Sequence, residues 1–405
     1  MADQPPVNGT SSGPIPVLTR KERRQNAAAA RRDGRRNGRR TWGYLLGGAS
    51  TAVLAVGAAL VFTAHHQDAR AAVTTTTTTT KPAAAPTAFC PLRGTPAPGG
   101  VVPARPALAI KIGNYTGDRP SAGLNQADIV FEEPVEGAIT RLVAVFQCQS
   151  APLVGDLRSA REPDVGILSQ LSDPIFVHAG GIAPILSLLA DAPLTDENIL
   201  DGGTDSAIVS APPNRVAPYS TFTSTAAAWA LDARDKTPPA PIFAYGPTLP
   251  AGSIAGSGGS VHIPFSSTSD VTWTWNPSKG VYLRSYSGVP DILIGGSQTA
   301  ATNVVVMSVQ TYTGPWVENS EGAQEVEVTD TGSGPLLVLR DGVAITGTWS
   351  RSSETGPAGL VTSTGIPITL APGNTWEELV PDGITATAAP IPAAPMPTRA
   401  KSANH

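Results

Sequence analysis

One uncharged segment near the amino terminus constrains this chain more than any other feature. Residues 41–64 read TWGYLLGGASTAVLAVGAALVFTA and contain no charged side chain. As a helix the segment would be about 36 Å long, whereas the hydrocarbon core of a bilayer is about 30 Å thick. Soluble helices of this length are rarely apolar on every side. The sequence therefore predicts one transmembrane helix over residues 42–64, with Trp42 and Tyr44 at an interface.

The charges beside this segment predict its orientation. Ten Lys and Arg residues precede it, the last being Arg40, whereas only Arg70 follows closely. Because Lys and Arg near a span stay on the cytoplasmic side, residues 1–41 are expected to form a cytoplasmic tail, with the folded part outside the cell membrane. A cleaved export signal is the alternative, since Arg39-Arg40 precede the apolar run and Ala69-Arg70-Ala71 offers small residues for cleavage.

The charge of the remaining chain argues against a nucleic-acid partner. The whole chain has 28 Lys and Arg against 32 Asp and Glu, and residues 1–40 hold ten of the cations but only three of the acids. The part beyond residue 40 is therefore acidic, and an acidic body repels phosphate. We expect the basic tail to touch anionic lipid headgroups instead, so the predicted partner is the membrane, through a single span.

The two cysteines agree with a location outside the cytoplasm. Cys90 and Cys148 both follow the apolar segment, and a lone pair in an oxidising compartment most simply forms one disulfide. Two buried free thiols remain the alternative. No Cys or second His lies near His178 in the sequence, so we predict neither a metal site nor a cofactor.

Composition divides the rest of the chain. Residues 65–88 include seven consecutive threonines followed by KPAAAPTA, which have too little apolar surface to pack, so a stalk is predicted. Residues 382–405 return to low complexity and are expected to be a disordered tail. The nearly 300 residues between exceed what one compact core usually holds, which favours two domains, over 89–240 and 261–381, joined by a Gly/Ser linker at 241–260.

The two predicted domains differ in hydrophobic pattern, which predicts an α+β protein: a mixed α/β domain followed by a β-rich one. In the first, the pattern predicts strands at 107–112, 128–132, 142–147 and 175–178, and helices at 164–171, 185–189 and 224–235, the last capped by Thr223 or Ser224. In the second it predicts strands at 271–275, 281–286, 303–309, 325–329, 336–340 and 343–349. Asp341-Gly342 favours a tight hairpin turn between the last two.

Long ordered strings in both predicted domains resemble the YerB-like family of bacterial envelope proteins. They are residues 105–147 (RPALAIKIGNYTGDRPSAGLNQADIVFEEPVEGAITRLVAVFQ), 154–164, 274–285, 301–309, 345–351 and 370–381. The resemblance covers essentially the whole folded part. It implies a two-part extracytoplasmic protein, often a lipoprotein, with two domains of unknown function and no established catalytic chemistry.

Two departures from the family pattern matter. No cysteine directly follows the apolar run, so the lipid anchor of the family is absent and the predicted span would replace it. Gly113 stands where members of the family usually carry Asp before Asn114. That exchange argues against an essential acid at this position.

Three acids and an arginine form the first candidate site. Glu132, Glu133 and Glu136 surround the end of a predicted strand, and Arg141 follows. Glycoside cleavage requires two carboxyl groups about 5 to 9.5 Å apart, a separation that short spacing along the chain does not establish. Catalysis, binding and structural ion pairing therefore all remain open for these residues.

Three further features extend the candidate site. Arg158 and Arg161 would share one face of a helix, where their guanidinium groups would suit a carboxylate or phosphate, unless they neutralise the glutamates inside the domain. His178 ends the apolar strand IFVH before a glycine turn, which suits either a binding site or a structural histidine. Asn214 follows Pro212-Pro213 in a stiff loop that could face the same cleft.

Together these patterns favour a membrane-anchored protein whose outer part binds a cell-envelope component. The expected ligand is peptidoglycan or a partner protein in cell-wall assembly or remodelling, and the expected contacts are Glu132, Glu136, Arg141, Arg158 and Arg161. The alternative is a cell-wall glycan or peptide hydrolase that uses paired glutamates. The sequence favours binding over catalysis without deciding between them.

Overall fold

The structure is a computed structural model that describes residues 88–392 except 201–206, 210, 233–236 and 320. These residues belong to one compact unit, Lys81–His405. The predicted cytoplasmic tail, the predicted transmembrane helix at 42–64 and all but the last residue of the predicted stalk lie outside the described residues. Within the described ranges, no helix has the length and apolar character needed to cross a bilayer.

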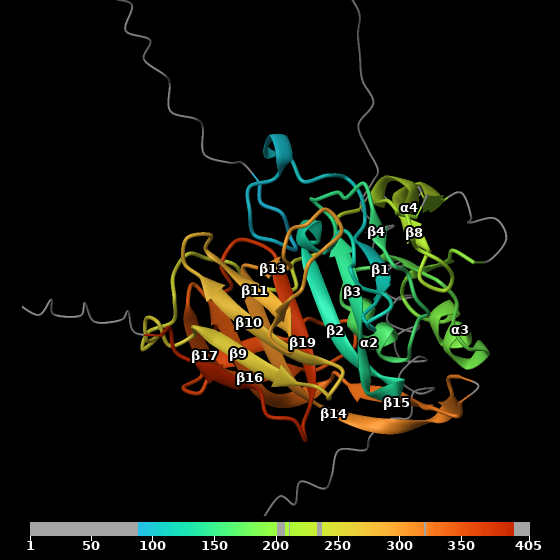
Figure 1. Ribbon diagram of the computed structural model, residues 1–405. Coiled ribbons are helices and arrows are strands. Elements are labelled where there is room, and N and C mark those ends of the chain that lie inside the picture. Colours follow the sequence, from blue (N-terminus) through green and yellow to red (C-terminus); the bar gives the residue numbers. More distant parts are fainter. Residues whose placement is uncertain (1–87, 201–206, 210, 233–236, 320, 393–405) are drawn as a thin grey trace, which may run out of the picture. The chain divides into compact units, whose positions relative to one another are not determined.

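The fold is β-rich and is built on one mixed sheet of eleven strands (Figure 1). Across the sheet the strands run β18 (Gly359–Thr362), β17 (Val343–Arg351), β16 (Gly332–Arg340), β14 (Asn303–Val317), β19 (Thr375–Pro381), β2 (Ile129–Val135), β3 (Ile139–Phe146), β1 (Leu108–Gly113), β5 (Ile175–His178) and β6 (Thr195–Asn198). The remaining strand, β15 (Gln324–Thr329), pairs with the outer half of β14 and forms a long arm with it. Both parallel and antiparallel neighbours occur in this sheet.

Two smaller sheets accompany the large one. The second has the order β12 (Val289–Pro290), β11 (Val281–Tyr286), β10 (Asp270–Asn276), β9 (Ser260–Pro264) and β20 (Thr387–Ala389), with β13 (Ala300–Ala301) paired to β11. The third contains β4 (Val154–Gly155), β8 (Phe222–Thr223) and β7 (Ile208–Val209). In Figure 1 the second sheet lies beside the C-terminal strands of the large sheet, whereas β4 and β8 lie near α4.

The helices among the described residues are few and short. The α-helices are α2 (Pro163–Ser169), α3 (Ala183–Ala190) and α4 (Thr225–Leu231), and the 3-10 helices are η1 (Pro98–Gly100), η2 (Leu124–Gln126) and η3 (Glu136–Ala138). Pro163 occupies the first turn of α2, where its missing N–H costs no hydrogen bond. The Ser224 side chain accepts a hydrogen bond from the Ala227 N–H at 3.1 Å, which caps α4 as predicted.

Two hydrophobic cores cover the two faces of the large sheet. One core contains Ile110 of β1 together with Trp273 of the second sheet, and the other contains Ala109 of β1 together with Leu168 of α2. Successive side chains of a strand point to opposite faces, so each core takes alternate residues of β1. Because both faces are covered, every residue of β1 is buried, including Lys111. Any charged side chain in the middle of this sheet therefore needs a partner inside the protein.

The large sheet crosses the predicted domain boundary. Strand β19, from the predicted domain 261–381, pairs in parallel with β2, from the predicted domain 89–240. The predicted linker at 241–260 contributes Ile242 and Phe243 to the core on the helix side of the sheet. The two segments are therefore joined by backbone hydrogen bonds and by a shared core, not by a flexible connection alone.

The end of the chain also departs from the expectation of a disordered tail over 382–405. Within this range β20 pairs with β9 in antiparallel register, and the Ile391 N–H donates to the Gly256 carbonyl at 2.7 Å. Although the composition of this segment is of low complexity, Thr387–Ala389 form β20, the last strand at one edge of the second sheet. Residues 393–405 lie outside the described residues.

Several local predictions are confirmed. The strand predicted at 281–286 has the same bounds as β11, and the predicted disulfide joins Cys90 and Cys148. Asp341 and Gly342 both have positive φ, 53° and 71°, as a two-residue hairpin turn between β16 and β17 requires.

Candidate functional site

The three predicted glutamates do not face one another. Glu132 and Glu133 are consecutive residues of β2 and therefore point to opposite faces of the large sheet. Glu136 lies beyond the strand, in η3. This arrangement separates the three carboxylates into different environments, so they do not form a common carboxylate pair.

Glu132 belongs to a buried network that joins the large sheet to the second sheet. Its carboxylate accepts hydrogen bonds from Thr140 Oγ1 at 2.6 Å and Asn114 Nδ2 at 3.0 Å, and it is ion-paired with Arg284 of β11. Arg284 also contacts Asp291 at 3.2 Å. We call these five residues the Arg284 network. Glu132 and Arg284 are both fully buried, so no polymeric ligand contacts either of them in this conformation.

Glu133 is paired on the other face of the sheet. Lys111 of β1 donates to Glu133 and, at 2.7 Å, to Asp164 of α2. Burial, and next the charge of Asp164, raise the pKa of Glu133 to about 8, although Lys111 opposes the shift. Glu133, Asp164 and Lys111 therefore form a structural cluster in which two acids share one cation.

Glu136 is neutralised by Arg161. The Arg161 side chain donates to both carboxylate oxygens of Glu136, through Nε at 2.7 Å and through one terminal nitrogen. Although burial alone would raise the pKa of Glu136, the hydrogen bonds from Arg161 and the charge of Arg141 lower it to about 2. Arg161 also donates to the Ala160 carbonyl at 2.9 Å and lies 3.4 Å from Glu318. Its guanidinium is therefore fully engaged inside the protein, as the alternative from the sequence expected.

The expectation that Arg158 and Arg161 share a helix face is wrong. Helix α2 begins only at Pro163, so both arginines precede it on non-helical backbone. Pro163 has no N–H, so a helix that began before Arg158 would lack the hydrogen bond from residue 163 to the residue 159 carbonyl. The two side chains accordingly take different partners, Asp118 for Arg158 and Glu136 for Arg161.

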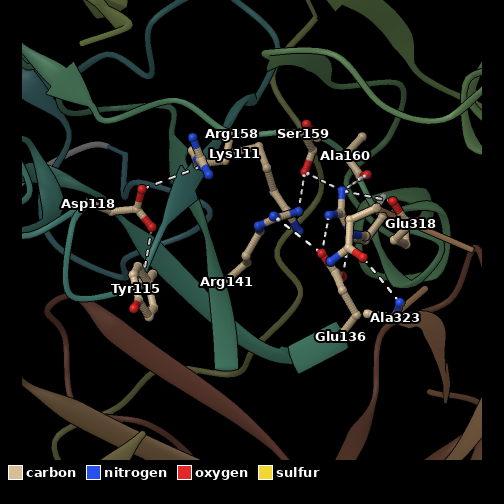
Figure 2. Close-up of polar contacts among 12 residues, drawn as sticks. Lys111, Tyr115, Asp118, Glu136, Arg141, Arg158, Ser159, Ala160, Glu318 and Ala323 are labelled. Atoms are coloured by element: carbon tan, nitrogen blue, oxygen red, sulfur yellow. Dashed lines mark hydrogen bonds and ion pairs between the residues drawn. The ribbon is translucent and has the colours of Figure 1, made fainter. Parts of the chain in front are cut away.

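Arg141 lies between these two ion pairs, as Figure 2 shows. It is only 6% exposed, yet with the residues that the structure describes its side chain makes one hydrogen bond, from a terminal nitrogen to the Ser159 carbonyl at 3.1 Å. Its nearest carboxylate oxygen, on Glu136, is 3.6 Å away, which is too long for a hydrogen bond. Burial, and next the charge of Arg161, lower the pKa of Arg141 to about 10. The charge of Arg141 is thus less well compensated than that of Arg161.

Arg158 and Asp118 form the open side of the same cluster. The Arg158 side chain is 24% exposed, lies 3.4 Å from Asp118 and donates to the Pro218 carbonyl at 3.0 Å. Asp118 accepts a hydrogen bond from the Tyr115 N–H at 2.8 Å. We call Asp118, Glu136, Arg141, Arg158 and Arg161 the arginine cluster.

Asp118 occupies the space that a side chain at Gly113 would fill. A Cβ added to Gly113 would overlap the Asp118 carboxyl group and would lie 2.6 Å from Arg158 Cγ. Gly113 is also paired directly with Arg141 across β1 and β3. An acid therefore does face Arg141 at this place, supplied by residue 118 and not by residue 113.

His178 and Asn214 do not join the arginine cluster. His178 is fully buried, with Nδ1 2.8 Å from the Gly180 carbonyl and Nε2 2.7 Å from Asp196 Oδ1. Both ring nitrogens are therefore occupied, as in a structural histidine. Asn214 is exposed and has a positive φ of 67° in a turn. In the described part of the chain, no group of three or more His, Cys, Asp and Glu side chains could hold a metal ion.

Comparison with known proteins places these features in a family. The family model "Protein of unknown function (DUF3048) N-terminal domain" matches residues 92–238, and the corresponding C-terminal domain matches residues 261–376. The chain belongs to this YerB-like family. It is 28% identical to "Putative lipoprotein YerB" of Bacillus subtilis (strain 168) over 310 residues, which is 74% of this chain and 88% of that protein. The crystal structure of YerB from Bacillus subtilis superposes with a TM-score of 0.63 and 25% identity, covering 74% of this chain and 99% of the YerB chain.

Two acids of the cluster region were missed in the sequence. Asp118 follows Gly113 by five residues, and the departure from the YerB-like pattern at Gly113 was a signal to search nearby for a replacing acid. Asp156 precedes Arg158 by two residues and is completely buried. One of its carboxylate oxygens accepts from the Thr221 N–H at 3.0 Å, whereas the other has no hydrogen-bond partner. Burial raises the pKa of Asp156 to about 7.

Proposed function

We propose that this chain is a membrane-anchored extracytoplasmic protein that binds an anionic group of a cell-envelope component, such as peptidoglycan or a partner protein, in cell-wall assembly or remodelling. The uncharged segment at 42–64 and the cations before it support the anchor and its orientation. The Bacillus subtilis relative is named a putative lipoprotein, which supports a membrane-associated place outside the cytoplasm. The Cys90–Cys148 disulfide is in keeping with an oxidising compartment.

Unused hydrogen-bond donors on Arg141 are the observation that supports binding of an anion. A guanidinium has five N–H donors, and Arg141 uses one of them in a described hydrogen bond. The Arg141 side chain keeps 8% of its surface exposed. We propose that its remaining donors face this exposed part, where a carboxylate or phosphate would pair with them.

Arg158 would provide the second contact for such a ligand. It lies on the open side of the cluster, and its 3.4 Å ion pair with Asp118 is weaker than the two-fold hydrogen bonding of Arg161 with Glu136. Arg158 is otherwise held by a hydrogen bond to the Pro218 carbonyl and by the Tyr219 ring, whose centroid lies 5.4 Å from its guanidinium carbon, so it would turn toward an incoming anion without leaving a buried charge unpaired. Of the five contacts expected from the sequence, three are ion-paired inside the protein: Glu132, Glu136 and Arg161. The proposed contacts are therefore Arg141 and Arg158.

The geometry offers no support for a hydrolase that uses paired glutamates. Glu132 and Glu133 are fully buried on opposite faces of the sheet, and both are ion-paired. Glu136 is held ionised by Arg161, which suits neither the protonated acid nor a free base that such a reaction needs.

A co-sedimentation experiment with purified sacculi tests the proposal. We expect the full-length protein to pellet with sacculi, and the double variant Arg141→Gln/Arg158→Gln to bind at least about tenfold more weakly, because a charge-assisted hydrogen bond contributes about 1.5–3 kcal/mol. Lys279→Gln is the matched control, since it removes one exposed cation from the turn between β10 and β11. Equal binding by the double variant and the control would refute the assigned site.

Protease treatment of intact cells tests the compartment. The folded part should be digested by added protease without lysis, since it is proposed to lie outside the membrane. If digestion required lysis, the topology and every envelope partner proposed with it would be wrong.

A further inference from the structure

A hollow between the two family-matched segments is lined by residues that the proposed function does not use. Its volume is about 430 Å³, within the range of roughly 300–1,000 Å³ that is typical of small-molecule sites. One wall is the loop after β1, with Thr116, Arg119 and Pro120, and the other is β12 with the two residues that follow it, Asp291 and Ile292. The first wall belongs to the segment 92–238 and the second to the segment 261–376. Ligand sites are frequent where two such segments meet.

Arg119 is the cation of this hollow. Its guanidinium carbon lies 3.7 Å from the centroid of the Tyr286 ring, and one terminal nitrogen donates to Thr116 Oγ1 at 3.4 Å, which is long for a hydrogen bond. The two neighbouring acids, Asp118 and Asp291, are ion-paired with other arginines. Within the described ranges, no carboxylate lies at ion-pair distance from Arg119, so its charge is available to an anion in the hollow.

Consecutive residues of one loop serve the arginine cluster and the hollow separately. Asp118 is paired with Arg158, as Figure 2 shows, whereas Arg119 lies over the Tyr286 ring. Neither Arg158 nor Arg141 lines the hollow. An anion at Arg119 would therefore occupy a site distinct from the one proposed above.

Apolar side chains form much of the remaining lining. Val289 is 66% exposed and Ile292 is 42% exposed, and Pro120 and Pro290 lie beside them. An apolar ligand group that covers such surface removes it from water, which is favourable. Because so much of Val289 is open to solvent, a short apolar group would be covered more completely than a long acyl chain.

The backbone of β12 limits how a peptide can bind here. The Asp291 N–H donates to the Arg284 carbonyl at 3.0 Å, toward β11, so the backbone of the preceding Pro290 faces the outer edge of the sheet. Proline has no N–H, and an added strand could therefore not continue the ladder of hydrogen bonds. The Pro290 carbonyl can still accept one N–H from a ligand.

We propose that this hollow binds the carboxyl-terminal residue of a peptide or protein whose last side chain is apolar. The terminal carboxylate pairs with Arg119, the side chain covers Val289 and Ile292, and the N–H of the same residue donates to the Pro290 carbonyl. Asp291 also lines the hollow and would repel an acidic last side chain. The inference is independent of the proposed function, since it uses neither Arg141 nor Arg158.

A methyl NMR titration of the full-length protein, labelled at Ile and Val, tests the inference. The main probe is N-acetyl-glycyl-leucine. Its carboxyl-terminal amide lacks the charge, N-acetyl-glycyl-glycine lacks the apolar side chain, and 4-methylpentanoate lacks the N–H. We expect the main probe to shift the Val289 and Ile292 methyl signals and to bind about tenfold or more tightly than its amide, because a charge-assisted hydrogen bond is lost. It should bind severalfold more tightly than the other two probes.

Variants at both ends of the hollow sharpen the test. In Arg119→Gln the preference for the acid over the amide should fall below about threefold, whereas the matched control Lys279→Gln should keep it. In Val289→Ser, at a largely exposed position, the preference for the leucyl over the glycyl peptide should fall severalfold. Both changes lie at partly or largely exposed residues, so both variants should fold.

Four results would overturn the inference. Equal binding of the acid and the amide, or a preference unchanged in Arg119→Gln, would remove the carboxylate from Arg119. No binding of the main probe at millimolar concentration would remove the site. Equal binding of 4-methylpentanoate would replace the peptide terminus with a small free acid. Binding that is lost in Arg141→Gln/Arg158→Gln but kept in Arg119→Gln would place the probe at the arginine cluster.

Discussion

Two groups of charged residues lie on opposite faces of the same pair of strands, β2 and β3, and they differ in their exposure to solvent. The Arg284 network is closed to solvent: its cation lies between two carboxylates and Glu132 has three partners, although Arg284 Nε is buried without a hydrogen-bond partner. The arginine cluster is open: Arg141 makes one hydrogen bond and Arg158 is partly exposed. The comparison teaches that burial of charge alone does not make a group a candidate for binding, and that access from solvent has to be considered with it.

Removing the cation of the closed network should produce the largest change. Arg284→Met leaves Glu132 and Asp291 buried without their cation, so the free energy of unfolding should fall by about 3–5 kcal/mol, measured by denaturant titration. Adding Glu132→Gln should recover part of the loss, because one of the two uncompensated charges is then removed. Should the single variant be as stable as Lys279→Gln, the network would not be the closed unit described above.

The contrast between the two groups explains what the sequence could and could not provide. Strands such as 281–286 and the Asp341-Gly342 turn depend on local periodicity and turn chemistry, and they were predicted. The pairing of β19 with β2 joins residues far apart in the chain, which leaves no local pattern, and so the shared sheet was not predicted. The Arg284–Glu132 pair spans 152 residues and was missed for the same reason.

At the candidate site the residue types were predicted more successfully than their pairing. Arg141, Arg158, Arg161 and Glu136 do gather in one cluster, but the sequence could not separate the satisfied Arg161 from the incompletely paired Arg141. That difference depends on backbone carbonyls and carboxylates brought together by folding. Asp118 was missed because its role arises from the empty space at Gly113.

Filling the space at Gly113 should give the next largest effect. In Gly113→Ala the new methyl group overlaps the Asp118 carboxyl group, so the protein should lose about 1–3 kcal/mol of stability, as overpacked sites do. The double variant Gly113→Ala/Asp118→Gly should regain most of this loss, measured by thermal and denaturant unfolding. A single variant as stable as the parent would show that Asp118 does not occupy this space.

The pH dependence of stability tests the buried Lys111–Glu133 pair at a smaller scale. Because the folded-state pKa of Glu133 is raised to about 8, the folded protein binds more protons than the unfolded chain between about pH 4.5 and 8. Stability should therefore decrease as the pH rises through this window, by up to about 1.4 kcal/mol per pH unit for this group. Glu133→Gln should reduce the slope without abolishing it, because Asp156 and Glu377 also have a raised pKa of about 7, whereas a slope unchanged by this variant would assign the titration to those groups.

Replacing Arg158 should give the smallest change in stability, although Arg158 is one of the two proposed contacts for the ligand. Arg158 is partly exposed and its ion pair with Asp118 is long, so Arg158→Gln should alter the free energy of unfolding by less than about 1 kcal/mol. The same substitution should still weaken co-sedimentation with sacculi severalfold, because the ligand loses one of its two cationic contacts. A variant that lost stability as Arg284→Met does, with binding reduced only in proportion to unfolding, would place Arg158 with the closed structural charges and would remove the distinction between the two groups.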